Sequence, residues 1–210
     1  MTTYKNSILF FLILLFSFAS NVHAEETNVH DVVRFSVQKV LLVLKEERDT
    51  FEENPDRLMA KILRVTEPVV AFDSIARSVM GKYKKQATIK QKNDFAKVFK
   101  DTMIKLYVKA LIAFESEDII ILPPEPGKIY TKKAKVPLNV TSIDGTLYKV
   151  IYSMRKNKKG QWQAKNMIVD GINLGLTYLN QFDSAMNRYN QDMDKVIESW
   201  QQDMSTASTE

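Results

Sequence analysis

The stretch FDSIARSVMGKYKKQATIKQKNDFAKVFKDTMIKLYVKALIAF, residues 72–114, decides the fold. It contains two helical patterns joined by a short basic link. Asp73 can accept hydrogen bonds from the first turn of the first helix, and Gly81 is suited to end that helix. The second helix begins at Thr88, where Gln91 completes a capping box. Apolar residues then recur at helical spacing, which predicts one long amphipathic helix.

The dry face of this second helix is rich in large, deformable side chains. Its members are Phe95, Val98, Phe99, Met103, Leu106, Tyr107, Ala110, Leu111 and Phe114. Most amphipathic helices simply cover a sheet, so the stripe can be ordinary core. Ordinary core is the more frequent case, but because Met and aromatic side chains repack easily, the stripe can also be a wall that packs against something other than protein. The residues leave both interpretations open.

The chain before this stretch is also helical. Apolar residues at helical spacing predict a helix over about 28–48. Asn54-Pro55 then opens a shorter helix, because Pro is well tolerated in a first turn. Glu67-Pro68 ends it. The first part of the protein is therefore predicted to be helices with short links.

After Glu115 the pattern changes from helical to alternating. A short apolar run over 119–122 is stopped by a Pro-rich segment, and Asp144-Gly145 marks a hairpin between two alternating segments. With 162–169, these segments predict a twisted antiparallel sheet of about four strands. A last helix follows, and we expect the polar residues 201–210 to form a frayed tail. Helices first and strands second indicate an α+β fold, with the helices on one face of the sheet.

Residues 1–24 read as a secretory signal. A short polar start with Lys5 precedes an apolar run over 8–18, and Val22-His23-Ala24 resembles a cleavage site. The apolar run is shorter than the ~20 residues that span a bilayer. We therefore expect an exported protein whose mature part, 25–210, is a single domain.

Composition excludes several classes of chemistry. The chain has no Cys, and of its two histidines His23 leaves with the signal while His30 lies near the new N-terminus. The composition therefore argues strongly against a His-based metal site, a catalytic triad or a His/Cys pair, and no cofactor is expected. A modest positive charge on an exported protein also argues against nucleic-acid binding.

Two separated motifs resemble the MlaC family, also called toluene-tolerance auxiliary proteins. The first runs from Phe72-Asp73 through Met80-Gly81-Lys82-Tyr83 to Gln86-Ala87-Thr88 and Gln91. The second is Trp162, Ile168-Val169-Asp170-Gly171-Ile172-Asn173-Leu174, Tyr178 and Gln181-Phe182. The resemblance covers nearly all of the chain after its first thirty or so residues.

The resemblance implies a periplasmic phospholipid-binding shuttle without catalytic activity. In that family the sheet and helices enclose an apolar cavity that holds acyl tails. The implied partners are phospholipid, an inner-membrane ABC-type lipid transporter complex and an outer-membrane lipoprotein complex. We expect a monomer.

Apolar residues on the predicted inner faces are the candidates for tail contact. Each one singly can also be core, so the prediction concerns the set: Phe72, Ile75, Val79, Met80, Tyr83, Phe99, Met103, Tyr107, Val150, Tyr152, Met154, Ile168, Leu174 and Tyr178.

Charged residues suggest a head-group or partner surface. Lys82, Lys84 and Lys85 cluster between the two central helices, and Lys156, Lys158 and Lys159 cluster on a hairpin. Basic residues attract phosphate head groups, but either cluster can be a solvated turn. Asp170 can dock a partner or form a turn beside Gly171.

Two other functions remain possible from the residues alone. A small exported enzyme on a similar cone-shaped fold could use Asp73, Glu115 or Asp170 as acid or base. No pair of carboxylates has a spacing that forces such a site. A structural adhesion module would leave the apolar excess as core alone.

Overall fold

The structure, a computed structural model, describes residues 28–113 and 116–207. Six α-helices and a sheet of five strands form an α+β fold, which confirms the predicted fold class. The helices are α1 Val29–Glu47, α2 Pro55–Thr66, α3 Phe72–Val79, α4 Ile89–Ala113, α5 Leu174–Arg188 and α6 Met193–Ala207, with 3-10 helices η1 Arg48–Thr50 and η2 Gly81–Lys85. The strands are β1 Ser116–Ile121, β2 Lys133–Ser142, β3 Leu147–Lys156, β4 Trp162–Val169 and β5 Ile172–Asn173. The predicted signal segment 1–24 lies outside the described residues.

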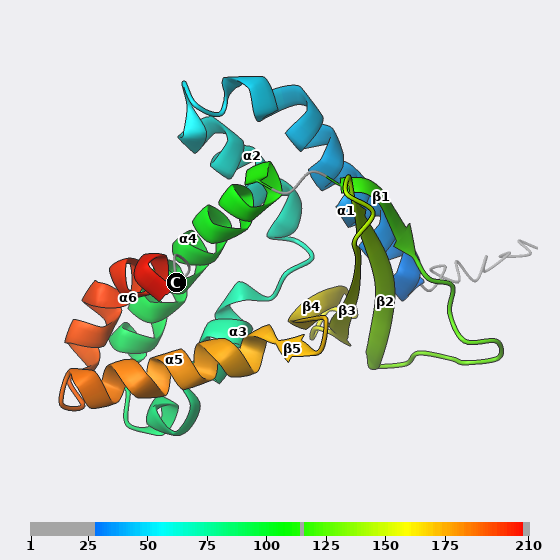
Figure 1. The fold of residues 1–210 in the computed structure, drawn as a ribbon. Helices are drawn as coiled ribbons and strands as arrows, with labels where there is room; N and C mark the ends of the chain where they lie inside the picture. The colour runs from blue at the N-terminus through cyan, green and yellow to red at the C-terminus, as the bar shows by residue number, and fades with distance from the viewer. Residues whose placement is uncertain (1–27, 114–115, 208–210) are drawn as a thin grey trace, which may run out of the picture.

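The sheet is an antiparallel meander in sequence order, β1-β2-β3-β4-β5. The long strands β2 and β3 pair with Val136 opposite Tyr152 and Leu138 opposite Val150, so their apolar residues share one face. Figure 1 shows the sheet on one side of the molecule and helices α4, α5 and α6 on the other. The fifth strand, two residues long, was not expected from the sequence.

Three helices start at the predicted positions, and a side chain caps each start. The Asn28 side chain accepts from the His30 N–H, and the Asn54 side chain accepts from the Arg57 N–H. Thr88 and Gln91 bond reciprocally to each other's backbone N–H groups, at 3.0 and 3.1 Å, before α4 begins.

The start of α3 differs from the prediction. Ala71 stands at the N-cap position without a side-chain hydrogen bond, and Asp73 lies inside the first turn. There its negative charge still interacts favourably with the positive end of the helix dipole. Gly81 has φ +51°, the left-handed conformation that a helix-ending glycine supplies, so that part of the prediction is confirmed.

The C-terminal region contains two helices where one was expected. Asn190 and Gln191 have positive φ and turn the chain, and the Asp192 side chain then accepts from the Lys195 N–H at the start of α6. Helix α6 continues to Ala207 and buries Met204 against the other helices, so most of the expected polar tail is helical. Residues 208–210 lie outside the described part.

The buried apolar residues form three clusters around the centre of the molecule. The helical cluster joins α3, α4, α5 and α6 through Phe95, Phe182 and Trp200. The sheet cluster joins the start of α1 to β2, β3 and β4, and the third cluster joins α1, α2 and the end of α4. A domain of this size usually has one contiguous core, so the division needs a structural cause.

The link between α2 and α3 ties the helical part to the sheet. The Ala71 N–H donates to the Ala164 carbonyl at 3.0 Å, and the Ala164 N–H donates to the Val69 carbonyl at 2.8 Å. Val70 thereby forms a parallel bridge with Ala164 of β4. None of the described helices combines the length and apolar character needed to cross a membrane.

Candidate functional site

A cavity of about 760 Å³ lies where the three apolar clusters meet. Its wall is formed by α1, α3, α4, α5, α6, β3 and β4, together with the end of α2 and the link that follows it. Most of the lining is apolar. The lining residues are Val33, Ser36, Val37, Val40, Thr66, Val69, Val70, Phe72, Ile75, Phe99, Met103, Ile104, Leu106, Tyr107, Lys109, Ala110, Tyr152, Met154, Ala164, Asn166, Met167, Leu174, Gly175, Thr177, Tyr178, Gln181, Met204 and Ser205.

Helix α4 supplies the longest continuous part of this wall. Its residues Phe99, Met103, Leu106 and Ala110 recur at helical spacing and all line the cavity. They belong to the apolar stripe that the sequence allowed to be either ordinary core or the wall of a cavity. The structure makes the second half of this stripe a cavity wall.

Two tyrosines from opposite walls meet within the site. The hydroxyls of Tyr107 of α4 and Tyr152 of β3 interact by a hydrogen bond. Burial raises the pKa of Tyr107 well above its ordinary value and also raises the pKa of Tyr152 and of Tyr178. All three hydroxyls are therefore neutral at physiological pH, and the wall carries no phenolate.

Asn166 of β4 fixes the end of the cavity where α5 begins. Its side-chain oxygen accepts from the Gly175 N–H at 2.9 Å, and its amide donates to the Asn173 side chain at 2.8 Å. A Cβ on Gly175 would lie 2.7 Å from the Asn166 oxygen, so only glycine permits this close approach. The sequence analysis did not identify Asn166, although an Asn near the end of an apolar strand was a visible signal.

Lys109 is the one described cation among the lining residues. It is exposed, as is the neighbouring lining residue Ala110, so this part of α4 borders both the cavity and solvent. The Gln181 side-chain oxygen is buried at the wall and has no hydrogen-bond partner in the described part of the chain. These two residues are the polar groups best placed to meet a polar part of a ligand.

The structure brings together most of the residues proposed from the sequence. Those that line the cavity are Phe72, Ile75, Phe99, Met103, Tyr107, Tyr152, Met154, Leu174 and Tyr178. Their contact with a ligand stays a prediction, but their placement on one surface is a property of the fold.

The other candidates lie away from the cavity. Val79, Met80 and Tyr83 pack inside the helical cluster, and Val150 packs inside the sheet cluster. Ile168 pairs with Ile151, on the opposite face of the sheet from the lining pair Tyr152 and Met167. We leave these residues out of the site.

A register shift explains the position of Ile168. The pairing shifts between Ser153 and Met154, so that Ala164 and Asn166 oppose consecutive residues of β3 and the intervening Lys165 forms a bulge. In a regular strand every second residue lies on the same face, so Ile168 would lie on the cavity side with Ala164. Because of the bulge, Met167 lies on the cavity side instead.

Sequence reasoning also missed the contribution of helices α1 and α6. Val33, Val37 and Val40 of α1 and Met204 of α6 line the cavity. The valines had a visible signal, because they follow the same helical spacing that predicted the helix. Met204 had none, because it lies in a polar segment.

The predicted head-group surface lies outside the cavity. Lys82 forms an ion pair with Asp183 of α5 at 2.7 Å, and its ammonium lies 5.0 Å from the Tyr83 ring centre. Lys84 and Lys85 are exposed on η2. None of the three lines the cavity.

Asp170 has a structural role in the turn after β4. It has φ +46°, its N–H donates to the Lys149 carbonyl, and its carboxylate accepts from the Lys149 N–H at 2.7 Å. These bonds close the end of the β3–β4 pair. The turn-forming interpretation accounts for the residue fully, and docking of a partner stays a prediction.

Neither described carboxylate that the sequence offered as an acid or base belongs to the cavity lining. Asp73 is exposed and neither it nor Asp170 lines the cavity, while Glu115 lies outside the described residues. No group of three or more potential metal-ligating side chains occurs in the described ranges. What the lining offers is a large apolar surface with neutral hydroxyls and a cation at its border.

Comparison with known proteins agrees with this geometry. The MlaC protein family matches residues 35–202. The toluene tolerance protein Ttg2D of Pseudomonas putida is 34% identical over 197 residues, covering 93% of this chain and 90% of that protein. The intermembrane phospholipid transport system binding protein MlaC of Haemophilus influenzae is 22% identical over 182 residues, covering 86% of this chain and 84% of that protein.

A solved structure has the same fold. The phospholipid-binding protein of Ralstonia solanacearum, determined in complex with a phospholipid, superposes with a TM-score of 0.74 at 19% identity. The match covers 86% of this chain and 99% of that one. The family match over most of the chain, together with the Ttg2D relationship, shows that this protein belongs to the MlaC family.

Proposed function

We propose that this protein is a phospholipid-binding shuttle that carries lipid between membrane complexes and performs no chemistry on it. The observation that carries the proposal is the 760 Å³ cavity and its predominantly apolar lining. That volume lies in the upper part of the range of ~300–1,000 Å³ typical of ligand sites. The relatives named for phospholipid transport and phospholipid binding support the same ligand class.

The physical requirement for such a carrier is protection of acyl tails from water. Each buried CH₂ contributes ~0.8 kcal/mol, so a phospholipid with two long chains leaves a membrane extremely slowly without a carrier. The lining of Phe, Met, Val, Leu and Tyr side chains can replace the membrane interior. Because Met103, Met154, Met167 and Met204 have flexible side chains, the wall can adapt to tails of different length.

The polar border of the cavity suits the other end of the ligand. Lys109 lies where the lining meets solvent, so its ammonium can neutralise a phosphate while the tails lie inside. We therefore propose that the acyl tails lie in the cavity and that the head group lies at its border.

We further propose that the protein works in the periplasm after removal of residues 1–24. Its proposed partners are an inner-membrane ABC-type transporter complex and an outer-membrane lipoprotein complex, which would supply and accept the lipid. Sequencing of the N-terminus of the protein purified from the periplasmic fraction should begin at Glu25. A protein that keeps residues 1–24 contradicts this part of the proposal.

The direct test of lipid binding is the organic extract of the purified protein. Expressed with its own signal segment and purified without detergent, the protein should yield phospholipid at a stoichiometry near one per chain, identified by mass spectrometry. It should also speed the transfer of labelled phospholipid from donor to acceptor vesicles. An extract without phospholipid, together with no transfer, would overturn the proposal.

A further inference from the structure

Charge is distributed very unevenly along this chain. Residues 122–169, which include β2, β3 and β4, contain ten Lys or Arg residues but only two carboxylates, Glu125 and Asp144. Residues 170–210 have the opposite balance, with seven carboxylates against Arg188 and Lys195. The segment with strands β2, β3 and β4 is therefore strongly basic, and the segment with the last two helices is acidic.

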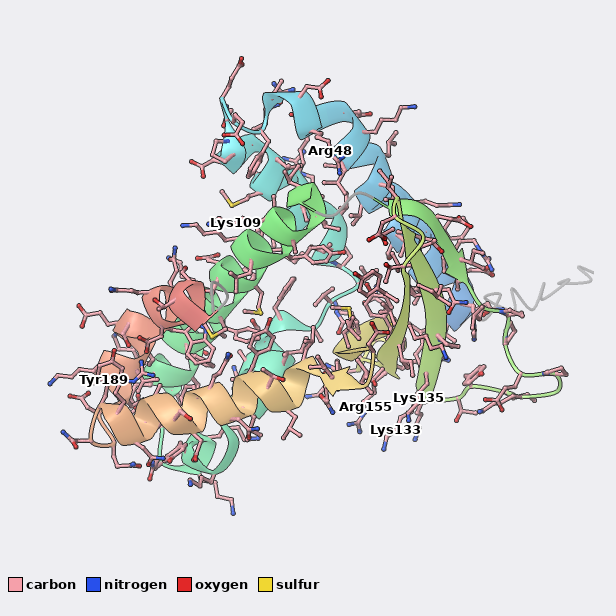
Figure 2. The ribbon with its side chains drawn as sticks, in the orientation of Figure 1. Arg48, Lys109, Lys133, Lys135, Arg155 and Tyr189 are labelled. Carbon is pink, nitrogen blue, oxygen red and sulfur yellow. The ribbon has the colours of Figure 1, made fainter. Side chains whose placement is uncertain are left out.

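The sheet cations gather on the face that points away from the cavity. Lys133 and Lys135 are exposed and alternate with the buried Ala134 and Val136, so they share the outer face of β2. Arg155 of β3 stands directly opposite Lys133 in the strand pairing. Figure 2 shows Lys133, Lys135 and Arg155 together at one end of the sheet. We call Lys133, Lys135, Arg155 and the neighbouring Lys165 the basic sheet face.

Within residues 28–113 and 116–207 these four cations have no compensating acid. No described carboxylate forms an ion pair with any of them. Like charges directly opposite each other on paired strands destabilise a sheet, and Lys133 and Arg155 have that arrangement. The pKa of Lys165 is lowered by burial and by the charge of Arg155, as expected beside an uncompensated cation. The sheet thus tolerates a local repulsion that no described group relieves.

The same face carries an aliphatic row between its charges. Pro137, Ile151 and Ile168 are paired directly across β2, β3 and β4, and all three are half-buried. Lys135 precedes this row on β2 and Lys149 precedes it on β3, two residues away in each case. The hairpin after β3 adds exposed Lys158 and Lys159 at the end nearest Arg155.

We propose that the basic sheet face docks the protein on an anionic lipid membrane surface. Such a surface attracts each nearby Lys or Arg by a similar amount, whatever the detailed geometry, and the aliphatic row can lie against the head-group region. A protein partner is the less suitable occupant. Protein interfaces are depleted in Lys and enriched in Tyr and Trp, whereas this face of β2, β3 and β4 is rich in Lys and has no aromatic residue.

The proposal is tested by flotation of the mature protein with vesicles of phosphatidylcholine alone or with a third of phosphatidylglycerol. The protein should bind the anionic vesicles, release in high salt, and bind the neutral vesicles weakly. The variant K133Q/K135Q/R155Q should partition roughly a hundredfold less onto the anionic vesicles, because three cations are lost.

A matched variant separates this face from general charge. K39Q/K92Q/K97Q removes three cations from helices α1 and α4, for which no ion pair occurs among the described residues, and should bind nearly as the natural protein does. Equal loss in the two variants would overturn the proposal. Failure of the natural protein to bind anionic vesicles would also overturn it. The face would then suit an acidic protein partner.

A single substitution gives a second readout. K133E places a carboxylate opposite Arg155, so it should raise the melting temperature while it weakens vesicle binding. A purely structural role for Lys133 predicts no change in vesicle binding. The docking proposal does not depend on what the cavity holds. The sheet variants should still yield bound phospholipid on extraction. Conversely, a protein without bound lipid could still float with anionic vesicles.

Discussion

The two halves of helix α4 use similar side chains for different purposes. In the first half Phe95 is fully buried, with its ring centre 4.8 Å from Phe182 and 5.1 Å from Trp200. In the second half Met103 and Tyr107 are half-buried and line the cavity. Both halves lie on one amphipathic helix with one helical spacing. What distinguishes them is the element that faces each half.

The first half of α4 faces helices α5 and α6, whose aromatic side chains reach it and fill the space. The second half packs Ile104 and Val108 against α1 and α2, and its remaining apolar side borders the cavity, whose lining on the side of the sheet includes Tyr152 and Met154. Two attachments hold the sheet in that position: the link through Val69 and Ala71 to β4, and the Asn166 side chain that receives the start of α5. The cavity therefore depends on how the scaffold is attached rather than on which side chains line it.

The largest expected effect comes from the filled half. Phe95→Ala should lower the free energy of unfolding by ~3–5 kcal/mol, because it removes a fully buried ring and leaves a void among Phe182 and Trp200. Urea denaturation followed by circular dichroism measures the change. A loss below about 1 kcal/mol would show that the aromatic cluster is not a tightly packed core.

A matched pair of methionines compares the two regions directly. Met186 is fully buried in the helical cluster, so Met186→Ala should cost ~2–5 kcal/mol. Met103 borders the cavity on one side, so Met103→Ala removes fewer contacts and should cost less than ~2 kcal/mol. Both values come from the same denaturation assay. Equal losses would contradict the distinction between filled core and cavity wall.

The attachment of α5 offers a smaller effect. Gly175→Ala places a Cβ against the Asn166 oxygen and should cost ~1–3 kcal/mol as overpacking at the cavity end. In an Asn166→Ala background the same substitution should cost little, because the clash is gone. The two measurements form a double-mutant cycle, and additive losses would exclude this contact as the cause.

Alkaline pH should weaken the cavity wall. Burial raises the folded-state pKa of Tyr107 above its unfolded value of 10.0, so the stabilising contribution is complete below pH 10 and is lost as pH rises further. The melting temperature of the natural protein should therefore fall above pH 10. Tyr107→Phe should fall less steeply over the same range, and parallel curves for the two proteins would contradict the assignment.

Much of the fold followed from local signals in the sequence. Helices begin at Asn28, Asn54 and Thr88 as predicted, and the alternating segments form the sheet. The missed features depended on single residues or on tertiary contacts. Asn190 and Gln191 divide the last helix through their backbone conformation, and the short β5 exists only by pairing with β4.

The site was less predictable than the fold, for a physical reason. Periodicity identifies which side of α4 is dry, but a filled core and an apolar cavity need the same residue types there. Met80 and Met103 therefore looked equivalent, although one is fully buried and the other lines the cavity. Ile168 was misplaced relative to the cavity because the bulge at Lys165 reverses the alternation. Neither distinction is local in sequence.

The central claim is that the cavity beside the second half of α4 holds the acyl tails of a phospholipid. Met103→Trp should fill part of it, whereas Asp101→Trp adds the same side chain at an exposed position of the same helix. Phospholipid extracted per chain and measured by mass spectrometry should fall at least tenfold in Met103→Trp and stay at the natural level in Asp101→Trp. Natural lipid content in a folded Met103→Trp protein would contradict the account.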